Sequence, residues 1–457
     1  MILVEAKITM KKVLVIGGGA REHAICDAVH RSQHVTLYSI MKNVNPGIKQ
    51  LAKEFGQINE TNIAEVVRFA DKHEVDLVFI GPEAPLEAGL TDALQEHNIA
   101  VCAPTKDAAR IETDKEWMRN ILEKYNINGQ LQYKSFNSID KARAFIEQLQ
   151  GNVVLKPIGL TGGKGVKVAG DHFTDTEGAI EYITHIFEKK IGGEAKVVIE
   201  EKAVGEEFTI QAFSDGKTIK PFPAVQDHKR LYPSDEGPNT GGMGSYSDKD
   251  GLLPFLNRKE YDTSVRILKK IISALSEEGC PFVGPIYGQF MLTVDGPKVI
   301  EINARFGDPE AMNILPLLQT DFIQISNAIL NQTLDEITLR FDKKSTVCKY
   351  VVPEGYGEKS VSDKLIRINA DEIKNSGALL FYASVNQEDE NVKTTSSRSL
   401  AVIGHGETIT EAESVCEDAL RYIHSDHIYI RHDIGTPDLI KQRIEHMNQL
   451  RGVKQTV

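Results

Sequence analysis

The sequence predicts a multidomain protein of α/β and α+β class: an N-terminal doubly wound parallel sheet, a central region with a glycine-rich flap, and a small β-rich C-terminal domain. From Lys11 to about Cys102, short apolar runs alternate with helical patterns, which is typical of a parallel sheet covered by helices. A glycine-rich stretch at 159–165 lies between two apolar runs, and the region after Phe341 has β-like runs with few polar motifs.

Length and composition fit a soluble protein with several cores. At roughly 150 residues per domain, 457 residues suggest about three domains. An apolar fraction of 41% with 26% charged residues excludes disordered and collagen-like chains. No window of 18 residues is continuously apolar, and the first ten residues lack a basic segment or cleavage site, which argues against a membrane span and a secretory signal.

Charge and cysteine usage narrow the class further. With 53 Lys and Arg against 65 Asp and Glu, the net charge is −12, which argues against nucleic acid as a partner. The cysteines are dispersed, odd in number and never in a CxxC pair, which predicts a cytoplasmic protein without a thiolate zinc site. They are Cys26, Cys102, Cys280, Cys348 and Cys416.

In the N-terminal region, ligands are expected beyond the carboxyl ends of the parallel strands. The predicted strands are 13–16, 35–40, 76–80 and 99–102, with helical patterns ending at Ala28 and spanning 86–96. The segments at the strand ends are Gly17–Glu22, Asn43–Gly47 and Gly81–Glu83. Residues 1–9 are either an extension outside the fold or precede a start at Met10.

A capping box marks the predicted end of this first domain. Thr113 stands three residues before Glu116 and is expected to begin a helix through about Tyr125. The predicted divisions are 10–112, 113–194, 195–330 and 331–457, and the last contains β-like runs at 346–352, 378–385 and 400–403.

The segment 153–168 predicts a strand, a phosphate-binding loop and a second strand. Its glycines let backbone N–H groups approach phosphate oxygens, and Lys164 adds a positive charge. It is not a P-loop, because Ile158 and Gly165 stand where that motif has glycine and Ser or Thr. A glycine-rich hairpin with solvated lysines is the alternative interpretation.

The apolar run 197–199 leads into a pair of carboxylates, Glu200 and Glu201. Backbone groups from Glu201 to Val204 can follow the edge of an adenine, and Glu207 can accept hydrogen bonds from ribose hydroxyls. Taken alone, this motif fits a solvated acidic turn better.

A predicted hairpin at 289–303 carries oxygen ligands for a metal. Period-two alternation places Val299, Glu301 and Asn303 on one face, and carboxylate and amide oxygens suit Mg²⁺. Gln289 lies opposite Asn303 if Pro297 belongs to the loop, and pairs with Ile302 if the turn has two residues. In the segment that follows, Arg305 can clamp a phosphate or carboxylate and Asp308 can hold an amine.

Two further segments read as a substrate loop and a lid. Asp227-His228-Lys229-Arg230 is a charged cluster able to meet anions, and 237–244 has too many glycines and turn formers for a regular element. A mobile surface loop is the alternative.

The order of these motifs resembles that of the ATP-grasp enzymes, which join a carboxylate to a nucleophile through an acyl phosphate. Within that superfamily, five segments are similar to the phosphoribosylamine–glycine ligase (glycinamide ribonucleotide synthetase) family over nearly the whole chain. They are VLVIGGGAREHA (13–24), GPEAPLEAGL (81–90), DHKR (227–230), GPNTGGMGSY (237–246) and NARFGDPE (303–310).

The resemblance implies a purine-biosynthesis ligase that uses ATP and Mg²⁺ or Mn²⁺ to join glycine to 5-phosphoribosylamine, with an N-terminal Rossmann-like substrate domain and an ATP-grasp core. Arg305 and Lys164 would be catalytic, and Glu301, Asn303 and Gln289 would surround the metal. ATP would be held by Lys115, Lys156, Gly162, Gly163, Lys164, Gly165, Glu200, Glu201, Ala203, Val204 and Glu207. Substrates would be held by Gly18, Arg21, Glu22, Asn45, Gly47, Glu83, Asp227, Lys229, Asn239, Thr240 and Asp308. Monomer and homodimer both fit.

The chain departs from the family pattern at three places. Gln289 stands where many ATP-grasp enzymes have a second metal carboxylate. Ser396-Ser397-Arg398 replaces glycines before arginine, and Gly355-Tyr356-Gly357 replaces a Gly-Tyr-Pro turn.

Three alternatives stay open on the sequence. Another ATP-grasp carboxylate–amine ligase, or a carboxylase of purine or biotin metabolism, would share the flap and hinge. A nicotinamide-dependent enzyme is suggested by Gly17-Gly18-Gly19, but Glu22 stands at the third fingerprint position and Tyr38-Ser39 ends the second strand where an acid is expected. A non-enzymatic nucleotide-binding module is the third.

Overall fold

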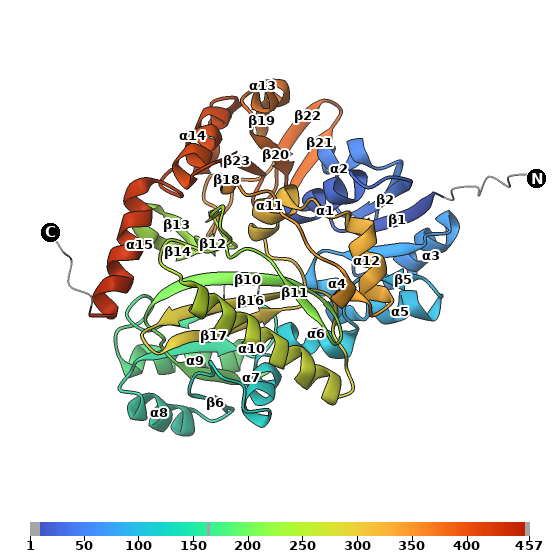
Figure 1. Cartoon of the computed structure of the whole chain (residues 1–457). Coiled ribbons are helices and arrows are strands. Elements are labelled where there is room, and N and C mark those ends of the chain that lie inside the picture. The colour runs from blue at the N-terminus through green and yellow to red at the C-terminus, as the bar shows by residue number, and fades with distance from the viewer. Residues whose placement is uncertain (1–9, 162–164, 453–457) are drawn as a thin grey trace, which may run out of the picture.

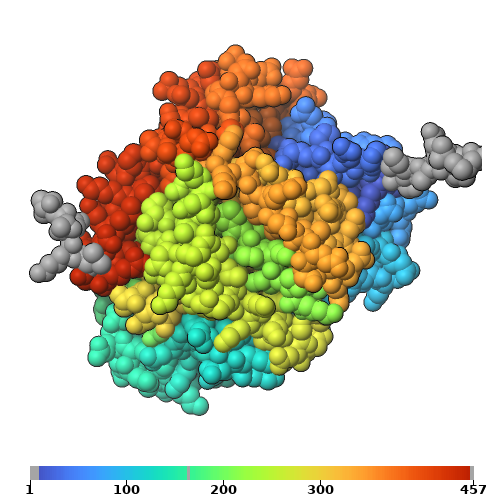
Figure 2. Space-filling model, viewed as in Figure 1, coloured from blue at the N-terminus to red at the C-terminus, as the bar shows by residue number. Residues whose placement is uncertain are grey.

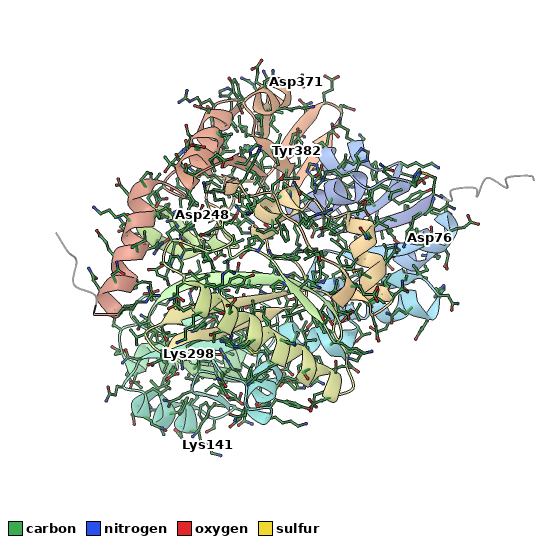
Figure 3. The ribbon with its side chains drawn as sticks, viewed as in Figure 1. Asp76, Lys141, Asp248, Lys298, Asp371 and Tyr382 are labelled. Atoms are coloured by element: carbon green, nitrogen blue, oxygen red, sulfur yellow. The ribbon has the colours of Figure 1, made fainter. Side chains whose placement is uncertain are left out.

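The computed structural model describes residues 10–161 and 165–452. Its parts surround a central antiparallel sheet, with the N-terminal domain on one side, the flap region below and the C-terminal region above (Figure 1). The same parts pack closely in the space-filling view (Figure 2), and Figure 3 shows Asp371 and Lys141 at opposite ends of the molecule. Among the described residues, no helix is long and apolar enough to cross a membrane.

The N-terminal domain contains the predicted parallel sheet, with strand order β3-β2-β1-β4-β5. Its strands are β1 (Lys11–Ile16), β2 (Val35–Met41), β3 (Glu54–Gln57), β4 (Leu77–Ile80) and β5 (Ala100–Val101). Among its helices are α1 (Ala20–His30), α2 (Pro46–Leu51) and α3 (Ile63–His73). The edge strand β3 was not predicted, because its sequence EFGQ holds a single large apolar residue and gives no apolar run.

The helix predicted at 86–96 is two helices, α4 (Glu83–Ala88) and α5 (Leu90–Glu96). The chain breaks at Gly89, whose φ of +89° is a left-handed conformation that ends α4. The apolar pattern continues across the break, so periodicity alone does not reveal it.

The predicted capping box is wrong by one residue. Thr113 is the last residue of α6 (Lys106–Thr113), and Asp114 is the N-cap of α7 (Lys115–Lys124). The Asp114 side chain accepts a hydrogen bond of 2.9 Å from the backbone N–H of Trp117. Glu116 is engaged elsewhere, in an ion pair of 2.5 Å with Lys196.

The flap region is a four-stranded sheet in the order β6-β9-β7-β8, flanked by α8 (Ile139–Gln148) and α9 (Thr176–Lys189). Its strands are β6 (Tyr133–Phe136), β7 (Val153–Pro157), β8 (Lys167–Val168) and β9 (Val197–Glu201). The antiparallel pair β7–β8 is the predicted strand–loop–strand. The predicted boundary at residue 194 precedes β9, which pairs with β6 and β7 in this sheet.

The core sheet has the order β11-β10-β16-β17 and is covered by α10 (Arg258–Glu277). Its strands are β10 (Glu206–Asp215), β11 (Ile219–Pro221), β16 (Val283–Thr293) and β17 (Gly296–Asn303). Phe208 on β10 stacks on Phe290 on β16 with ring centroids 5.4 Å apart. This packing on one face leaves the opposite face of the sheet to the polar cleft.

The C-terminal region is tied to the middle of the chain. Strand β18 (Ser345–Pro353) pairs with β15 (Gly244–Ser247) as well as with β23 (Leu400–Gly406). The helices α14 (Ile409–Leu420) and α15 (Pro437–Leu450) follow, and α15 extends toward the core sheet (Figure 1). The sheet that contains β15, β18 and β23 also includes β12 (Gln226–Asp227), β20 (Leu379–Tyr382) and β25 (Ile428–Ile430).

Candidate active site

A polar cleft of about 780 Å³ lies where all four parts meet. It is lined by Arg21 and Glu83 from the N-terminal domain, by the flap strands, by the hinge 201–207, and by the end of β17. Loop residues 227–230 and 239–241, with Arg398 and Arg443 from the C-terminal region, close its other side. The motifs far apart in the sequence therefore converge on one cavity.

A β-bulge sets the face on which the predicted metal ligands lie. Strands β16 and β17 join through a two-residue turn, and Gln289 pairs with Glu301 whereas its neighbour Phe290 pairs with Val299. Both predicted partners of Gln289 are thus wrong, because the turn is Val294-Asp295, with Gly296 already paired to Thr293, and the extra residue Ile300 shifts the register by only one position. The bulge also separates Val299, which packs in the core, from the cleft residues Glu301 and Asn303.

Glu301 and Asn303 lie side by side in the cleft, with the Asn303 amide donating to the Glu301 carboxylate at 3.2 Å. Burial raises the pKa of Glu301, but the charges of Lys229 and Lys156 outweigh it and lower that pKa to about 2. The carboxylate is therefore ionised at neutral pH. An ionised carboxylate beside an amide oxygen is a donor set that suits Mg²⁺ or Mn²⁺.

The side-chain amide of Gln289 is already hydrogen-bonded on both its oxygen and its nitrogen. Its amide oxygen accepts from Lys229 at 2.6 Å, and its amide nitrogen donates to Glu207 at 2.5 Å. With its oxygen engaged by an ammonium group, Gln289 is a poor metal ligand in this arrangement. No cluster of three or more His, Cys, Asp or Glu side chains suited to a metal occurs in the described ranges.

Glu200, predicted as a nucleotide contact, lines the cleft and is also the buried counterion of two cationic side chains. Both of its carboxylate oxygens accept from Arg119, at 2.8 and 2.7 Å, and one also pairs with Lys156 at 2.8 Å. Arg119 and Lys156 also donate to the carbonyl of Ile300, at 3.2 and 3.0 Å. The triad therefore holds Lys156 in the cleft and satisfies backbone groups that the bulge frees.

The other predicted nucleotide contacts lie around the hinge and the flap. Ala203, Val204 and Glu207 line the cleft, and Val204 is 55% exposed. Lys115 donates to the carbonyl of Gly159 at 2.6 Å, and the carbonyl of Gly165 accepts from Tyr182 at 2.7 Å. The predicted phosphate contacts Gly162, Gly163 and Lys164 fall outside the described residues.

Arg305 joins the core to the N-terminal domain. Its guanidinium pairs with Glu112 at 3.0 Å and with Glu83 at 3.5 Å, and it donates to the carbonyl of Phe306 at 3.1 Å. Glu112 also accepts from the backbone N–H of Ala304 at 2.6 Å. Two carboxylates of one domain thus fix the cationic side chain of another.

The predicted sugar-side residues divide into two groups. Arg21 and Glu83 reach the cleft, and Arg21 pairs with Glu22 at 2.7 Å. Gly18, Glu22, Asn45 and Gly47 do not line it. Asn45 is fully buried, caps α2 and donates to the carbonyls of Gly18 and Tyr382, at 2.9 and 2.7 Å, so it connects the N-terminal and C-terminal regions.

Gly47 has a steric role. A Cβ atom there would lie 1.9 Å from the buried ring of His23, so only glycine fits.

Of the other predicted substrate residues, Asp227, Lys229, Asn239 and Thr240 all line the cleft. Burial is the main cause that raises the pKa of Asp227, and the neighbouring carboxylate of Glu310 adds to it. Asp308 is already paired, with Tyr350 donating at 2.5 Å and Arg398 lying at 3.1 Å. An amine would therefore compete with two existing partners for Asp308.

Sequence reasoning missed several residues of this site, namely Glu112, Arg119, Glu310, Arg398 as a partner of Asp308, and Arg443. Arg119 was detectable in principle, since it interrupts the buried face of an amphipathic helix that also contains Met118 and Leu122. The others have no local pattern that marks them.

Comparison with known proteins matches the whole arrangement to one family. Three domain models of phosphoribosylglycinamide synthetase match the chain: the N domain at residues 11–112, the ATP-grasp (A) domain at 113–311 and the C domain at 346–437. Two relatives named phosphoribosylamine–glycine ligase, from Methanothermobacter thermautotrophicus and Methanococcus vannielii, are both 51% identical over 96% of this chain and 100% of their own length.

Solved structures agree with this match. A crystal structure of phosphoribosylamine–glycine ligase from Thermotoga maritima has a TM-score of 0.78 at 25% identity, covering 92% of this chain and 99% of that one. Biotin carboxylase from Campylobacter jejuni has a TM-score of 0.71 at 13% identity, covering 97% of this chain and 99% of its own, and shares the fold alone.

Proposed function

Because the chain belongs to the phosphoribosylglycinamide synthetase family, we propose that its cleft joins glycine to 5-phosphoribosylamine through a glycyl phosphate intermediate. The chain is an ATP-grasp carbon–nitrogen ligase of purine biosynthesis. In the proposed reaction the glycine carboxylate attacks the γ-phosphorus of ATP and releases ADP. The amine of phosphoribosylamine then attacks the acyl carbon, releases phosphate and forms the amide of glycinamide ribonucleotide.

The position of Arg305 is the observation that carries this proposal. It lies in the cleft at the junction of the core with Glu83 and Glu112 of the N-terminal domain. A ligase that receives ATP on the core side and a sugar phosphate on the other side needs a cation at this junction. Arg305 would stabilise charge on the transferring phosphoryl group and on the acyl phosphate.

ATP would lie between the flap and the core sheet. Lys115 and Lys156 would neutralise its phosphates, together with the predicted flap contacts Gly162, Gly163, Lys164 and Gly165. The backbone from Glu201 to Val204 would border the adenine, and Glu207 would accept from ribose hydroxyls. Glu200 acts through Lys156, which it holds at 2.8 Å.

Glu301 and Asn303 are the residues that would hold Mg²⁺ or Mn²⁺. The bound metal would neutralise phosphate charge during transfer. The low pKa of Glu301 favours this role, because the carboxylate stays ionised without the metal.

Glycine would lie near Asp227, Lys229, Asn239 and Thr240, which face the cleft from the loop. Phosphoribosylamine would bind toward Arg21 and Glu83, with Gly18, Glu22, Asn45 and Gly47 supporting that wall from behind. Closure of the flap would exclude water, which matters because acyl phosphates hydrolyse.

Two further proposals concern the cellular location and the oligomeric state of the enzyme. Its five free cysteines are all buried, which supports a cytoplasmic location. Both a monomer and a homodimer are compatible with a site built from one chain.

ADP release in the presence of glycine, with and without freshly generated phosphoribosylamine, tests the proposal. We expect turnover only when both are present, and a loss of at least 100-fold in Glu301→Ala, since one ligand and one charge are removed. Glu96→Ala, at an exposed position on α5, is the control and should retain full activity. Turnover that requires bicarbonate in place of glycine would instead indicate a carboxylase.

A further inference from the structure

The loop that carries Lys229 into the cleft includes a hairpin that lacks support from a larger sheet. Its strands β13 (Arg230–Tyr232) and β14 (Glu236–Asn239) form a two-stranded sheet of their own. An isolated two-stranded hairpin is marginally stable in water. At its tip, Ser234 and Asp235 have φ values of +58° and +55°, a left-handed conformation that non-glycine residues adopt rarely.

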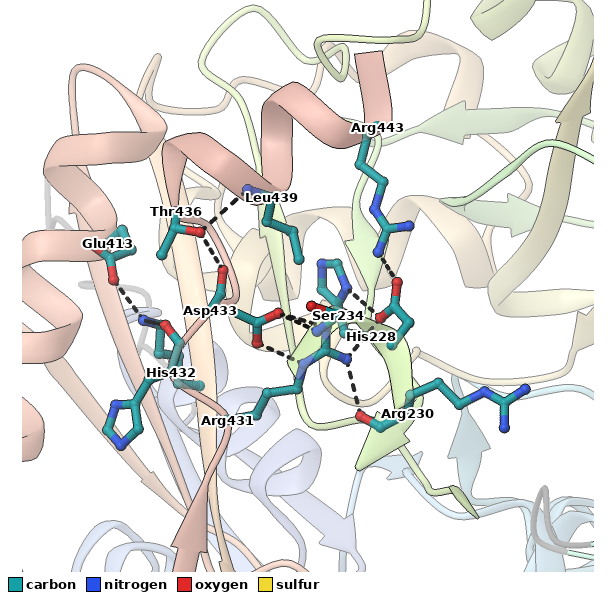
Figure 4. Close-up of polar contacts among 12 residues, drawn as sticks. His228, Arg230, Ser234, Glu413, Arg431, His432, Asp433, Thr436, Leu439 and Arg443 are labelled. Atoms are coloured by element: carbon teal, nitrogen blue, oxygen red, sulfur yellow. Dashed lines mark hydrogen bonds and ion pairs between the residues drawn. The ribbon is translucent and has the colours of Figure 1, made fainter. Parts of the chain in front are cut away.

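This hairpin is held at its tip by the C-terminal region, as Figure 4 shows. Arg431, which is fully buried, lies 2.8 Å from Asp235 and donates to the backbone carbonyl of Arg230 at 3.0 Å. Asp433 accepts from the N–H of Ser234 at 3.1 Å and itself pairs with Arg431 at 2.8 Å. One arginine and one aspartate thus hold the first strand and the tip of the hairpin.

A second arginine reaches the same aspartate from a different element. Arg443 on α15 pairs with Asp235 and lies 3.5 Å from Glu206, the first residue of β10. His228 lies 3.6 Å from Asp235, and burial lowers the pKa of this histidine to about 4, so it is neutral at physiological pH. Asp235 is therefore the point at which the C-terminal cations meet the hairpin.

The base of the hairpin leads directly into the cleft. Lys229 precedes β13 and contacts Gln289, and its backbone carbonyl accepts from both the N–H and the hydroxyl of Thr240, at 2.7 and 2.8 Å. Arg230 pairs with Asp171 of the flap region. A displacement of the hairpin tip would therefore move side chains that face both the substrates and the flap.

We propose that Arg431 and Arg443 are positioning residues, which act through Asp235 to hold the β13–β14 hairpin and thereby place Lys229 in the cleft. Arg443 and most of α15 lie beyond residue 437, where the match to the family's C domain ends. The catalytic part of this inference rests on the proposed function, because it assigns Lys229 to the glycine side. The structural part is that Arg431, Arg443 and Asp235, together called the clamp, hold the hairpin. This part does not depend on which reaction the cleft performs.

Two variants, Arg443→Gln and Asp235→Asn, weaken the clamp from opposite sides, and both keep the contacts of Arg431 with Arg230 and of Asp433 with Ser234. Arg451→Gln is the matched control, because Arg451 follows the same helix but pairs with Glu260 at 2.8 Å, away from the hairpin. Arg443→Lys keeps the positive charge, so we expect it to hold the hairpin better than Arg443→Gln does. Thermal unfolding establishes that each variant is folded, and if Asp235→Asn is not, Arg443→Gln carries the test.

The first measurement is hydrogen–deuterium exchange of the backbone amides at 229–240. We expect exchange at least ten-fold faster in both clamp variants and unchanged in the control. Unchanged exchange in folded clamp variants would overturn the proposal, whatever the enzyme's substrates are.

The second measurement is the KM for each substrate. We expect the KM for glycine to rise at least ten-fold in the clamp variants and the KM for ATP to rise less, because Arg443 also contacts Glu206 of the hinge and Arg230 pairs with Asp171 of the flap region. Faster exchange with an unchanged KM for glycine would overturn the catalytic part. A wild-type protein that shows no glycine-dependent ADP release would contradict the proposed function alone, since the exchange result still decides whether the clamp exists.

Discussion

At the residue scale, several charges around the cleft are buried and held by specific partners. Arg119 and Glu200 are 0% and 1% exposed, and their contact is bidentate. Such a pair is expensive to break, because removing one partner leaves the other charge buried and uncompensated. The arrangement serves the site, since Glu200 also fixes Lys156.

Arg119→Met should therefore destabilise the protein strongly. We expect a loss of about 3–5 kcal/mol in the free energy of unfolding, measured by denaturant titration. Arg143→Met removes an exposed ion pair with Glu177 in the same region and should have little effect. Equal stability of the two variants would contradict the structural role of the triad.

Glu112 gives a prediction about pH. Burial raises its pKa from 4.5 to about 7, although the charge of Arg305 opposes this. Between these values the folded protein holds a proton that the unfolded chain has released, so stability falls as pH rises through this window.

The variant Glu112→Gln lacks this proton. The melting temperature of the wild type relative to Glu112→Gln should therefore decrease between about pH 4.5 and 7 and then level off. Thermal unfolding across this range measures the difference. Parallel profiles for the two proteins would show that the pKa of Glu112 is not raised.

Local sequence patterns were enough to select Glu301, Asn303 and Lys156 as candidate site residues, and all three line the cleft. They did not predict partners that only folding brings together. Arg119 lies 81 positions from Glu200, and Glu112 lies 192 positions from Ala304. No periodicity within a window of 10 to 20 residues contains such a pair.

At the scale of elements, most strands and helices follow from apolar periodicity, and the differences have local causes. The bulge on β17 is stabilised by Arg119 and Lys156, which donate to the carbonyl of Ile300 from outside the hairpin. Its register therefore depends on residues that the hairpin sequence does not include. The shifted helix cap has a simpler cause, because Asp114 offers a capping oxygen one residue after Thr113.

The break between α4 and α5 leads to a prediction for Gly89. The left-handed conformation there should make Gly89→Ala less stable by about 1–2 kcal/mol, since a Cβ atom is disfavoured in that region. The nearest atom to that Cβ would be 3.6 Å away, so the effect is conformational and not a clash. Gly89→Asn is the control, because asparagine tolerates this conformation better. Chemical denaturation should rank glycine above asparagine above alanine, and equal stability of all three would contradict the assignment.

At the scale of the whole molecule, the net charge of −12 contrasts with anionic substrates. The cleft gathers Arg21, Lys156, Lys229 and Arg305 in one place, although its lining also holds more carboxylates than cationic side chains. We therefore expect ATP and a sugar phosphate to be attracted by these few cations together with a bound metal, and not by the overall field. The estimate of three domains from length also becomes four units, because the middle of the chain divides into a flap sheet and a core sheet.

We propose that one cleft joins glycine to phosphoribosylamine through a glycyl phosphate. The measurement that tests it most directly follows oxygen from the carboxylate of ¹⁸O-labelled glycine during turnover with ATP and phosphoribosylamine. We expect each turnover to transfer one glycine oxygen to inorganic phosphate, because the acyl carbon loses that oxygen when the amine attacks. Amide formation with unlabelled phosphate would contradict it.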